Sequence, residues 1–178
     1  MVKKPKAAMA GLTGLGLGYG LWRTWEATLD RVWQSTAGSP DLGPVDFATL
    51  RRRHNPNDAL ACPRDFCPEA KPDFEPPVFP VPPARLRAVL AEVASSEPNT
   101  TLVQSGTEQD RYLVRTRFWR FPDTVVAQVI GLDEDRSTLA LYSRSQLGRS
   151  DLGVNRRRLQ RWVERIGRLA APAEQRRP

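Results

Sequence analysis

The chain has 178 residues, which is enough for one domain with extensions. Its 16 prolines are above the average for globular proteins, so part of the chain should be extended rather than packed. The formal net charge of +7 would attract phosphate-bearing partners, either lipid headgroups or nucleic acid. The sequence shows no pattern of a catalytic triad, metal cage or phosphate-binding glycine loop, which favours a noncatalytic protein without a cofactor or metal.

The amino-terminal segment has the pattern of a membrane anchor. A lysine-rich start precedes the uncharged run of residues 7–22, which Arg23 follows. As a helix this run would extend about 24 Å, and continuing it to Trp25 brings it close to the roughly 30 Å hydrocarbon core. The nearest small-residue cleavage site, at residues 35–37, is too far downstream. We therefore predict an uncleaved single-pass anchor in the inner membrane, with the globular domain in the periplasm.

Small residues recur every four positions within this anchor, at Ala10, Gly14 and Gly18. Such a face lets a second membrane helix approach closely, so it would suit a helical partner or a homodimer. Alternatively, glycine is common in membrane segments for no specific reason.

The segment that follows divides into a helical extension and a proline-rich stretch. We assign residues 1–37 to the anchor and its helical extension, and residues 38–82 to extended chain that cannot sustain a helix or a central strand. A globular domain is predicted over residues 83–170, followed by a disordered tail at residues 171–178.

The only two cysteines, Cys62 and Cys67, lie within the proline-rich stretch. Their spacing allows a local disulfide, which an exported location would favour. Free thiols, or a metal or redox role, are the alternatives. The single histidine, His54, would leave a zinc site short of its four ligands.

The predicted domain is α+β. It has a four-stranded, mostly antiparallel sheet, with one helix before the strands in the chain and a closing helix after them. In the third predicted element, Arg111, Arg115 and Arg117 share one face, which should meet water, carboxylates or a ligand. The helices are predicted at residues 84–94 and 154–169, and the strands at residues 100–105, 111–119, 124–132 and 138–145.

The most distinctive stretch is residues 143–158, where the last strand should turn into the closing helix. One interpretation is a structural junction in which Ser150 and Asp151 cap the helix and Arg144 or Arg149 pairs with Asp123 or Asp151. The other is an anion site at the helix start, against which the Asp151 carboxylate argues. Its residues would be Ser143, Arg144, Ser145, Arg149 and Ser150.

The closing helix carries an arginine stripe made of Arg157, Arg161, Arg165 and Arg168. A solvated face is the simplest interpretation. A surface that contacts a membrane protein or anionic lipid is the alternative. Nucleic acid is the least favoured partner, because no recognised binding module accompanies the basic residues.

Several motifs in the chain resemble a bacterial and plant family, the domain-of-unknown-function family 1499. The resemblance covers about residues 55–166. It implies no established activity, and it implies small proteins that are often exported or attached to membranes. The motifs are NPNDALACP from residue 55, YLVRT at residues 112–116, FPD at residues 121–123, SRS at residues 143–145 and GRSDLGVN at residues 148–155.

Two functions remain at this point. The favoured one is a noncatalytic, membrane-anchored periplasmic domain that contacts a membrane protein or anionic lipid. The alternative is a small-molecule or lipid-binding domain, with or without enzyme activity, whose pocket lies between the sheet and a helix and is lined by Arg115, Trp119 and Arg144.

Overall fold

The computed structural model describes the backbone of residues 10–171 and the side chains of residues 19–171. The chain forms two compact units, Met1–Gly38 and Ser39–Pro178. The predicted packing face at Ala10, Gly14 and Gly18, most of the predicted anchor, and the tail at residues 172–178 therefore lie outside the described side chains. Over the part of the chain that is described, no helix is both long enough and apolar enough to cross a membrane.

The described part of the first unit, from residue 10 onward, forms the helix α1 (Ala10–Ala37). Within it, Arg23 and Glu26 form an ion pair of 3.2 Å one turn apart. Gly38 has a φ of +80° and its N–H donates to the Gln34 carbonyl at 3.2 Å, which ends the helix with a left-handed residue.

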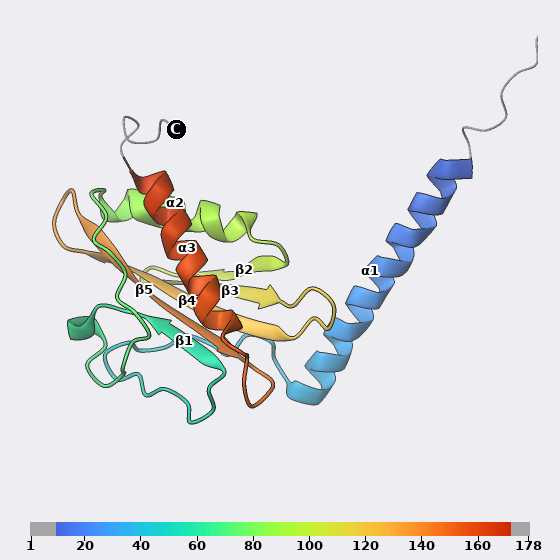
Figure 1. Cartoon of the computed structure of the whole chain (residues 1–178), viewed down its shortest axis with the longest axis horizontal. Helices are drawn as coiled ribbons and strands as arrows, with labels where there is room; N and C mark the ends of the chain where they lie inside the picture. Colours follow the sequence, from blue (N-terminus) through green and yellow to red (C-terminus); the bar gives the residue numbers. More distant parts are fainter. Residues whose placement is uncertain (1–9, 172–178) are drawn as a thin grey trace, which may run out of the picture. The chain divides into compact units, whose positions relative to one another are not determined.

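The second unit is α+β, as predicted, but its antiparallel sheet has five strands rather than four (Figure 1). The extra strand comes from inside the proline-rich stretch. The spatial order is β1-β5-β4-β3-β2, with β1 (Asp58–Ala61), β2 (Thr100–Ser105), β3 (Gln109–Arg115), β4 (Pro122–Gly131) and β5 (Ser137–Ser145).

Strand β1 is short and lies at the edge of the sheet. It pairs with β5 in a register that sets Asp58 opposite Arg144 and Ala61 opposite Leu141. Pro56 and Pro63 flank the strand without entering it, which is where a sheet tolerates proline. All four of its residues are buried, so β1 lacks the alternation that identifies a strand in sequence.

Helices α2 (Pro83–Ser96) and α3 (Val154–Ala170) cover one face of the sheet (Figure 1). Their apolar stripes pack on inward-facing residues of the strands, and the rings of Tyr112 and Trp162 meet edge to face at 5.7 Å. The helix residues of this core include Leu86, Val89, Leu90, Leu159, Trp162 and Ile166.

The other face of the sheet is covered by irregular chain from the proline-rich region. Phe47 and Leu50 pack there against Tyr142 of β5. Cys62 and Cys67 join the same cluster, with their sulfur atoms at disulfide distance and their Cα atoms 6.4 Å apart. A short 3-10 helix, η1 (Arg64–Phe66), lies between the two cysteines. The proline-rich stretch therefore forms one layer of the folded unit.

Candidate functional site

The distinctive stretch forms a corner where β5 ends at Ser145 and α3 begins at Val154. Two glycines make this turn possible, because Gly148 has a φ of +91° and Gly153 a φ of +75°. A Cβ atom on Gly153 would also lie 3.1 Å from the Arg157 guanidinium. The backbone at these two positions favours glycine over other residues.

Asp151 caps the start of α3. Its Oδ2 accepts the Asn155 N–H at 2.7 Å and its Oδ1 accepts the Gly153 N–H at 2.9 Å. Ser150 makes a weaker local contact, accepting the Leu152 N–H at 3.3 Å. A carboxylate of the chain itself therefore occupies the positive end of the helix, as the structural-junction interpretation requires.

An ion pair is buried beneath this corner. Arg158 Nη2 donates to Asp123 Oδ2 at 2.7 Å, and each side chain is only 4% exposed. Arg158 Nη1 also donates to Ser143 Oγ at 2.9 Å. Both charges are thus paired and hydrogen-bonded, which is the condition under which a protein tolerates them in its interior.

Asn155, which is fully buried, connects this ion pair to the rest of the corner. Its side-chain carbonyl accepts from Ser143 Oγ and Arg158 Nη1, while its Nδ2 donates to Ser145 Oγ at 3.0 Å and to the Asn57 carbonyl at 3.2 Å. Asn57 Nδ2 in turn donates to the Gly148 carbonyl at 2.7 Å.

These contacts bring together motifs that are far apart in the sequence. Asn57 belongs to the NPNDALACP motif and Asp123 to FPD, and the residues from Ser143 to Asn155 include SRS and GRSDLGVN, which together form the closing motif. The backbone adds two further bonds, from Ser145 N to the Asn57 carbonyl at 2.9 Å and from Asp151 N to the Pro56 carbonyl at 3.4 Å. Four of the five motifs that carry the family resemblance therefore meet at one corner.

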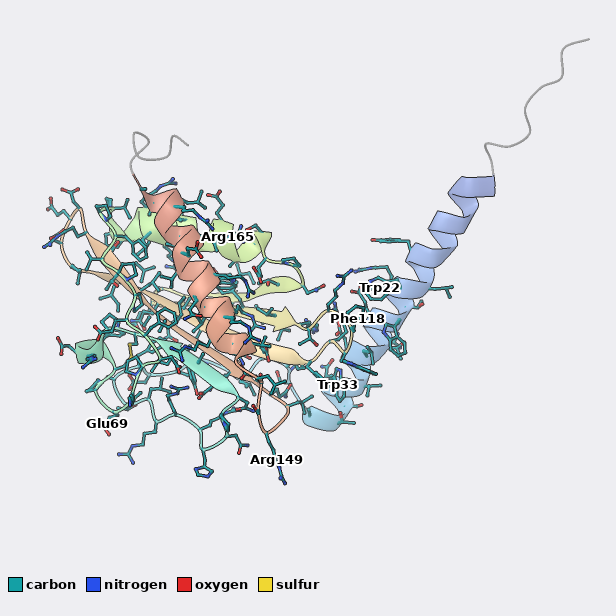
Figure 2. All side chains as sticks on the ribbon, viewed as in Figure 1. Trp22, Trp33, Glu69, Phe118, Arg149 and Arg165 are labelled. Carbon is teal, nitrogen blue, oxygen red and sulfur yellow. A yellow bond between two sulfur atoms is a disulfide. The ribbon has the colours of Figure 1, made fainter. Side chains whose placement is uncertain are left out.

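The five residues of the predicted anion site do not meet at one point. Ser143 and Ser145 are buried and contact α3. Arg144 lies on the opposite face of the sheet, where its Nη2 donates to the Leu42 and Gly43 carbonyls at 2.7 and 2.6 Å. Ser150 is exposed, and the Arg149 side chain points away from the ribbon (Figure 2). Burial lowers the pKa of the Arg144 guanidinium.

The expected ion pairs of the corner also differ in the structure. Asp123 pairs with Arg158, not with Arg144 or Arg149, and Asp151 accepts backbone amides. Arg158 was missed because it is the last of three consecutive arginines, at residues 156–158, and so resembles its exposed neighbours in the arginine stripe. The signal was nonetheless present: Arg158 lies four residues before Trp162, so extending the apolar stripe of α3 by one turn places it against the sheet.

A pocket of about 270 Å³ opens beside the same corner. Asp123 and Ser145, which are 3% and 7% exposed, form its floor. The charged residues that line it are the carboxylates of Asp123 and Asp151. The full lining is Thr116, Phe121, Asp123, Ser145, Leu147, Gly148, Ser150, Asp151, Leu152 and Val154.

The pocket of the alternative hypothesis is not formed by the residues proposed for it. Arg144 lies under residues 42 and 43, on the face of the sheet away from the helices. Trp119 lies in the turn between β3 and β4 and is 60% exposed. Arg115 ends β3 opposite Pro122.

A second polar network lies on the face of the sheet away from the helices. Tyr142 donates its hydroxyl to Asp58 Oδ2 at 2.5 Å, and Arg52 pairs with Asp58 at 2.6 Å and with Asp73 at 3.0 Å. Burial and the hydrogen bond to Asp58 raise the pKa of Tyr142. Burial alone would lower the pKa of Arg52, but the bond and charge of Asp58 outweigh it, so that pKa is raised. The network ties the irregular layer to the sheet.

Arg157, Arg161 and Arg168 of the arginine stripe are exposed and Arg165 is half-buried, yet each of the four contacts the protein. Arg161 pairs with Glu97 at 3.0 Å, and Arg168 with Glu164 at 3.4 Å. Arg165, labelled on α3 in Figure 2, donates to Ser96 Oγ at 2.6 Å. Arg157 donates to the Leu152 carbonyl at 3.0 Å. Exposed pairs of this kind are weak, so the guanidinium groups remain accessible to a partner.

No group of three or more His, Cys, Asp and Glu side chains within residues 19–171 is arranged to hold a metal ion. In a comparison with protein families, residues 42–166 match the family described as a protein of unknown function (DUF1499). Comparisons with curated proteins and with solved structures found no match.

Proposed function

We propose that this chain, which belongs to the DUF1499 family, is an exported accessory domain that its amino-terminal segment holds at the membrane and that acts by binding rather than by catalysis. The matched residues cover the whole corner described above. The family description assigns no activity, so the support for this proposal comes from the residues of the chain itself.

The cysteine pair is the observation that carries the proposal. Cys62 and Cys67 are at disulfide distance and are 0% and 1% exposed. Disulfides persist in oxidising compartments and are rare in the reducing cytosol. A pair built into a buried cluster of this chain therefore favours export.

The amino-terminal pattern supports the same location. Lysines precede the uncharged residues 7–22, and this order is typical of a segment that remains in the membrane with its amino terminus in the cytoplasm. Such a tether would keep the folded unit close to the bilayer surface.

The arginine stripe is the proposed contact surface. Arg157 and Arg161 are exposed on α3 and Arg165 is half-buried one turn further on, and a basic residue near an anionic leaflet gains about 1 kcal/mol. We propose anionic lipid headgroups, or the acidic surface of a membrane protein, as the partner.

Export is tested by fusing a reporter enzyme to the carboxyl terminus. We expect a reporter that is active only after export to be active in the fusion, and a cytosolic reporter to be inactive. Replacing Lys3, Lys4 and Lys6 with glutamate should reduce the exported signal. Activity confined to the cytosolic reporter would contradict the proposed location.

The contact surface is tested with the full chain and sedimenting vesicles. We expect binding to vesicles that contain phosphatidylglycerol, a several-fold loss of binding in the R157A/R161A/R165A variant, and a further decrease with added salt. The matched control is R51A/R64A/R136A, which removes the same charge from residues whose ion pairs are also exposed. An equal loss in both variants would show a general charge effect and not a defined surface. A detergent pull-down with the same variants tests the membrane-protein partner.

A further inference from the structure

The corner pocket is lined by polar and apolar groups that have no part in the proposed export or membrane contact. Its volume is about 270 Å³, close to the lower limit for ligand pockets, so it suits a small molecule rather than a folded partner. Phe121, Leu147, Leu152 and Val154 supply apolar walls around the polar floor. Apolar walls with a few convergent polar atoms are the usual composition of a ligand site.

The floor offers both a hydrogen-bond donor and an acceptor. Ser145 Oγ accepts a bond from Asn155 Nδ2, which leaves its own hydroxyl proton to be donated. Asp123 uses Oδ2 for Arg158, and a carboxylate has a second oxygen that can accept. These two groups lie opposite each other on neighbouring strands, because Asp123 pairs in register with Ser145.

One wall residue is held in an unusual way. Leu152 has a φ of +52°, a conformation that is costly for a leucine, and it is 84% exposed at the edge of the pocket. Asparagine or glycine would suit this backbone better. A leucine here therefore neither favours the backbone conformation nor packs in the core. A binding site that needs an apolar wall would explain it.

Charge identifies the class of ligand. The charged groups lining the pocket are carboxylates, and Arg158 lies behind Asp123 and is already paired with it. An anionic ligand would be repelled. A cationic ligand would lose hydration to reach a carboxylate that already has a partner. A neutral hydroxyl, by contrast, can donate to Asp123 and accept from Ser145 at the same time.

We propose that the corner pocket between β4, β5 and the start of α3 binds a small neutral amphipathic molecule, with its hydroxyl group on the Asp123–Ser145 floor and its short apolar body against Leu152, Val154 and Phe121. Arg158 holds the Asp123 carboxylate in place and does not contact the ligand.

The test follows backbone amide shifts of the full-length chain by NMR while a matched series is added: 1-hexanol, hexylamine and hexanoate. We expect 1-hexanol to bind most tightly and to shift the amides of Gly148, Leu152 and Val154 in a saturable manner. If the chain is held in detergent micelles, a ligand that only partitions into the micelles would not shift these three amides selectively. Tighter binding of hexanoate or hexylamine, or no saturable shift at the corner up to the solubility limit of the alcohol, overturns the proposal.

Leu152→Asn separates a binding role from a structural one. Because asparagine tolerates this backbone, the variant should be at least as stable as the wild type, and its affinity for 1-hexanol should fall about fivefold as part of the apolar wall is lost. The matched control is Leu132→Asn, at an exposed leucine in the turn between β4 and β5, which should leave affinity unchanged. Unchanged affinity in Leu152→Asn overturns the proposal.

Discussion

At the scale of single residues, the second unit depends on a few buried polar groups whose partners come from distant segments. The side chains of Arg158 and Asp123 are each 4% exposed, and their ion pair joins α3 to β4. Removing one member of such a pair leaves a buried charge without a partner, which costs far more than the pair contributes when intact. The pair therefore constrains which substitutions the corner tolerates.

We predict that Arg158→Met lowers the free energy of unfolding by about 3–5 kcal/mol, measured by urea unfolding followed by tryptophan fluorescence. The double variant D123L/R158M should recover most of that loss, because no charge is then left buried. Arg157→Met, the exposed neighbour, should change stability by less than about 0.5 kcal/mol. Equal effects of Arg157→Met and Arg158→Met would contradict the buried ion pair.

We predict that the free energy of unfolding decreases at alkaline pH because of Tyr112. Burial, aided by the charge of Asp110, raises its pKa to about 12, above the model-peptide value of about 10. Between these two values the folded chain holds a proton that the unfolded chain has released. The free energy of unfolding should therefore be unaffected below about pH 10 and should decrease by up to about 1.4 kcal/mol per pH unit as pH rises toward 12.

Tyr112→Phe tests this directly, since it removes the titrating group and keeps the ring against Trp162. Urea unfolding at a series of alkaline pH values should show a shallower decline in the variant than in the wild type. The raised pKa of Tyr142 contributes to what decline remains. Identical slopes in both proteins would show that Tyr112 does not titrate in this range.

At the scale of elements, the sequence predicted most of what local pattern can specify. The strand at residues 100–105 coincides with β2, and the helix predicted at residues 154–169 with α3. The strand predicted over residues 111–119 ends early, at Arg115, because Thr116 starts a turn: the Arg120 N–H donates to its carbonyl at 3.1 Å, and Arg120 has a φ of +57°. Alternation through residues 116–119 hides this turn from sequence reasoning.

The start of α3 gives a prediction about capping. Asp151→Ala should lower the free energy of unfolding by about 1–2 kcal/mol, because two amides at the helix start lose their acceptor. Ser150→Ala should cost less than about 0.5 kcal/mol, since Ser150 accepts only one long bond. Thermal unfolding measures both variants, and amide exchange at Asn155 should quicken in Asp151→Ala alone. A larger effect of Ser150→Ala than of Asp151→Ala would show that Ser150, and not Asp151, is the cap.

At the scale of the whole molecule, the segment from Ser39 onward folds as one unit. Leu60, Phe47 and Cys62, all from the proline-rich stretch, pack on Tyr142 and Val126 of the sheet. Composition alone predicts that such a stretch is extended, and in the structure it contains the short strand β1, the 3-10 helix η1 and irregular chain. Composition does not predict which surface the stretch packs on, because packing on a sheet face involves residues far apart in the sequence and leaves no local periodicity.

The same limit applies to the candidate site. Its turn glycines, its capping Asp151 and its serines could be predicted from the closing motif. The partners Asn57 and Asp123 come from other segments, and only the fold reveals that they meet Arg158 there.

Truncation tests the extent of the folded unit. We expect the fragment of residues 39–178 to unfold cooperatively and to retain dispersed amide shifts. The fragment of residues 83–178, which begins at the boundary predicted from sequence, should not, because it lacks β1 and exposes the apolar face around Tyr142 and Ala140. Circular dichroism and amide spectra of the two fragments decide this. Cooperative unfolding of the shorter one would place the boundary at residue 83.

The burial of Cys62 and Cys67 determines how fast their redox state can change after the chain has folded. With the side chains 0% and 1% exposed, a dissolved thiol reaches the pair only when this part of the chain opens. Exchange with the surroundings is therefore slow once folding is complete. We therefore expect Cys62 and Cys67 in a freshly isolated sample to keep the disulfide or thiol state that they had in the compartment where the chain folded. This state should change only slowly after transfer into a buffer of different redox potential.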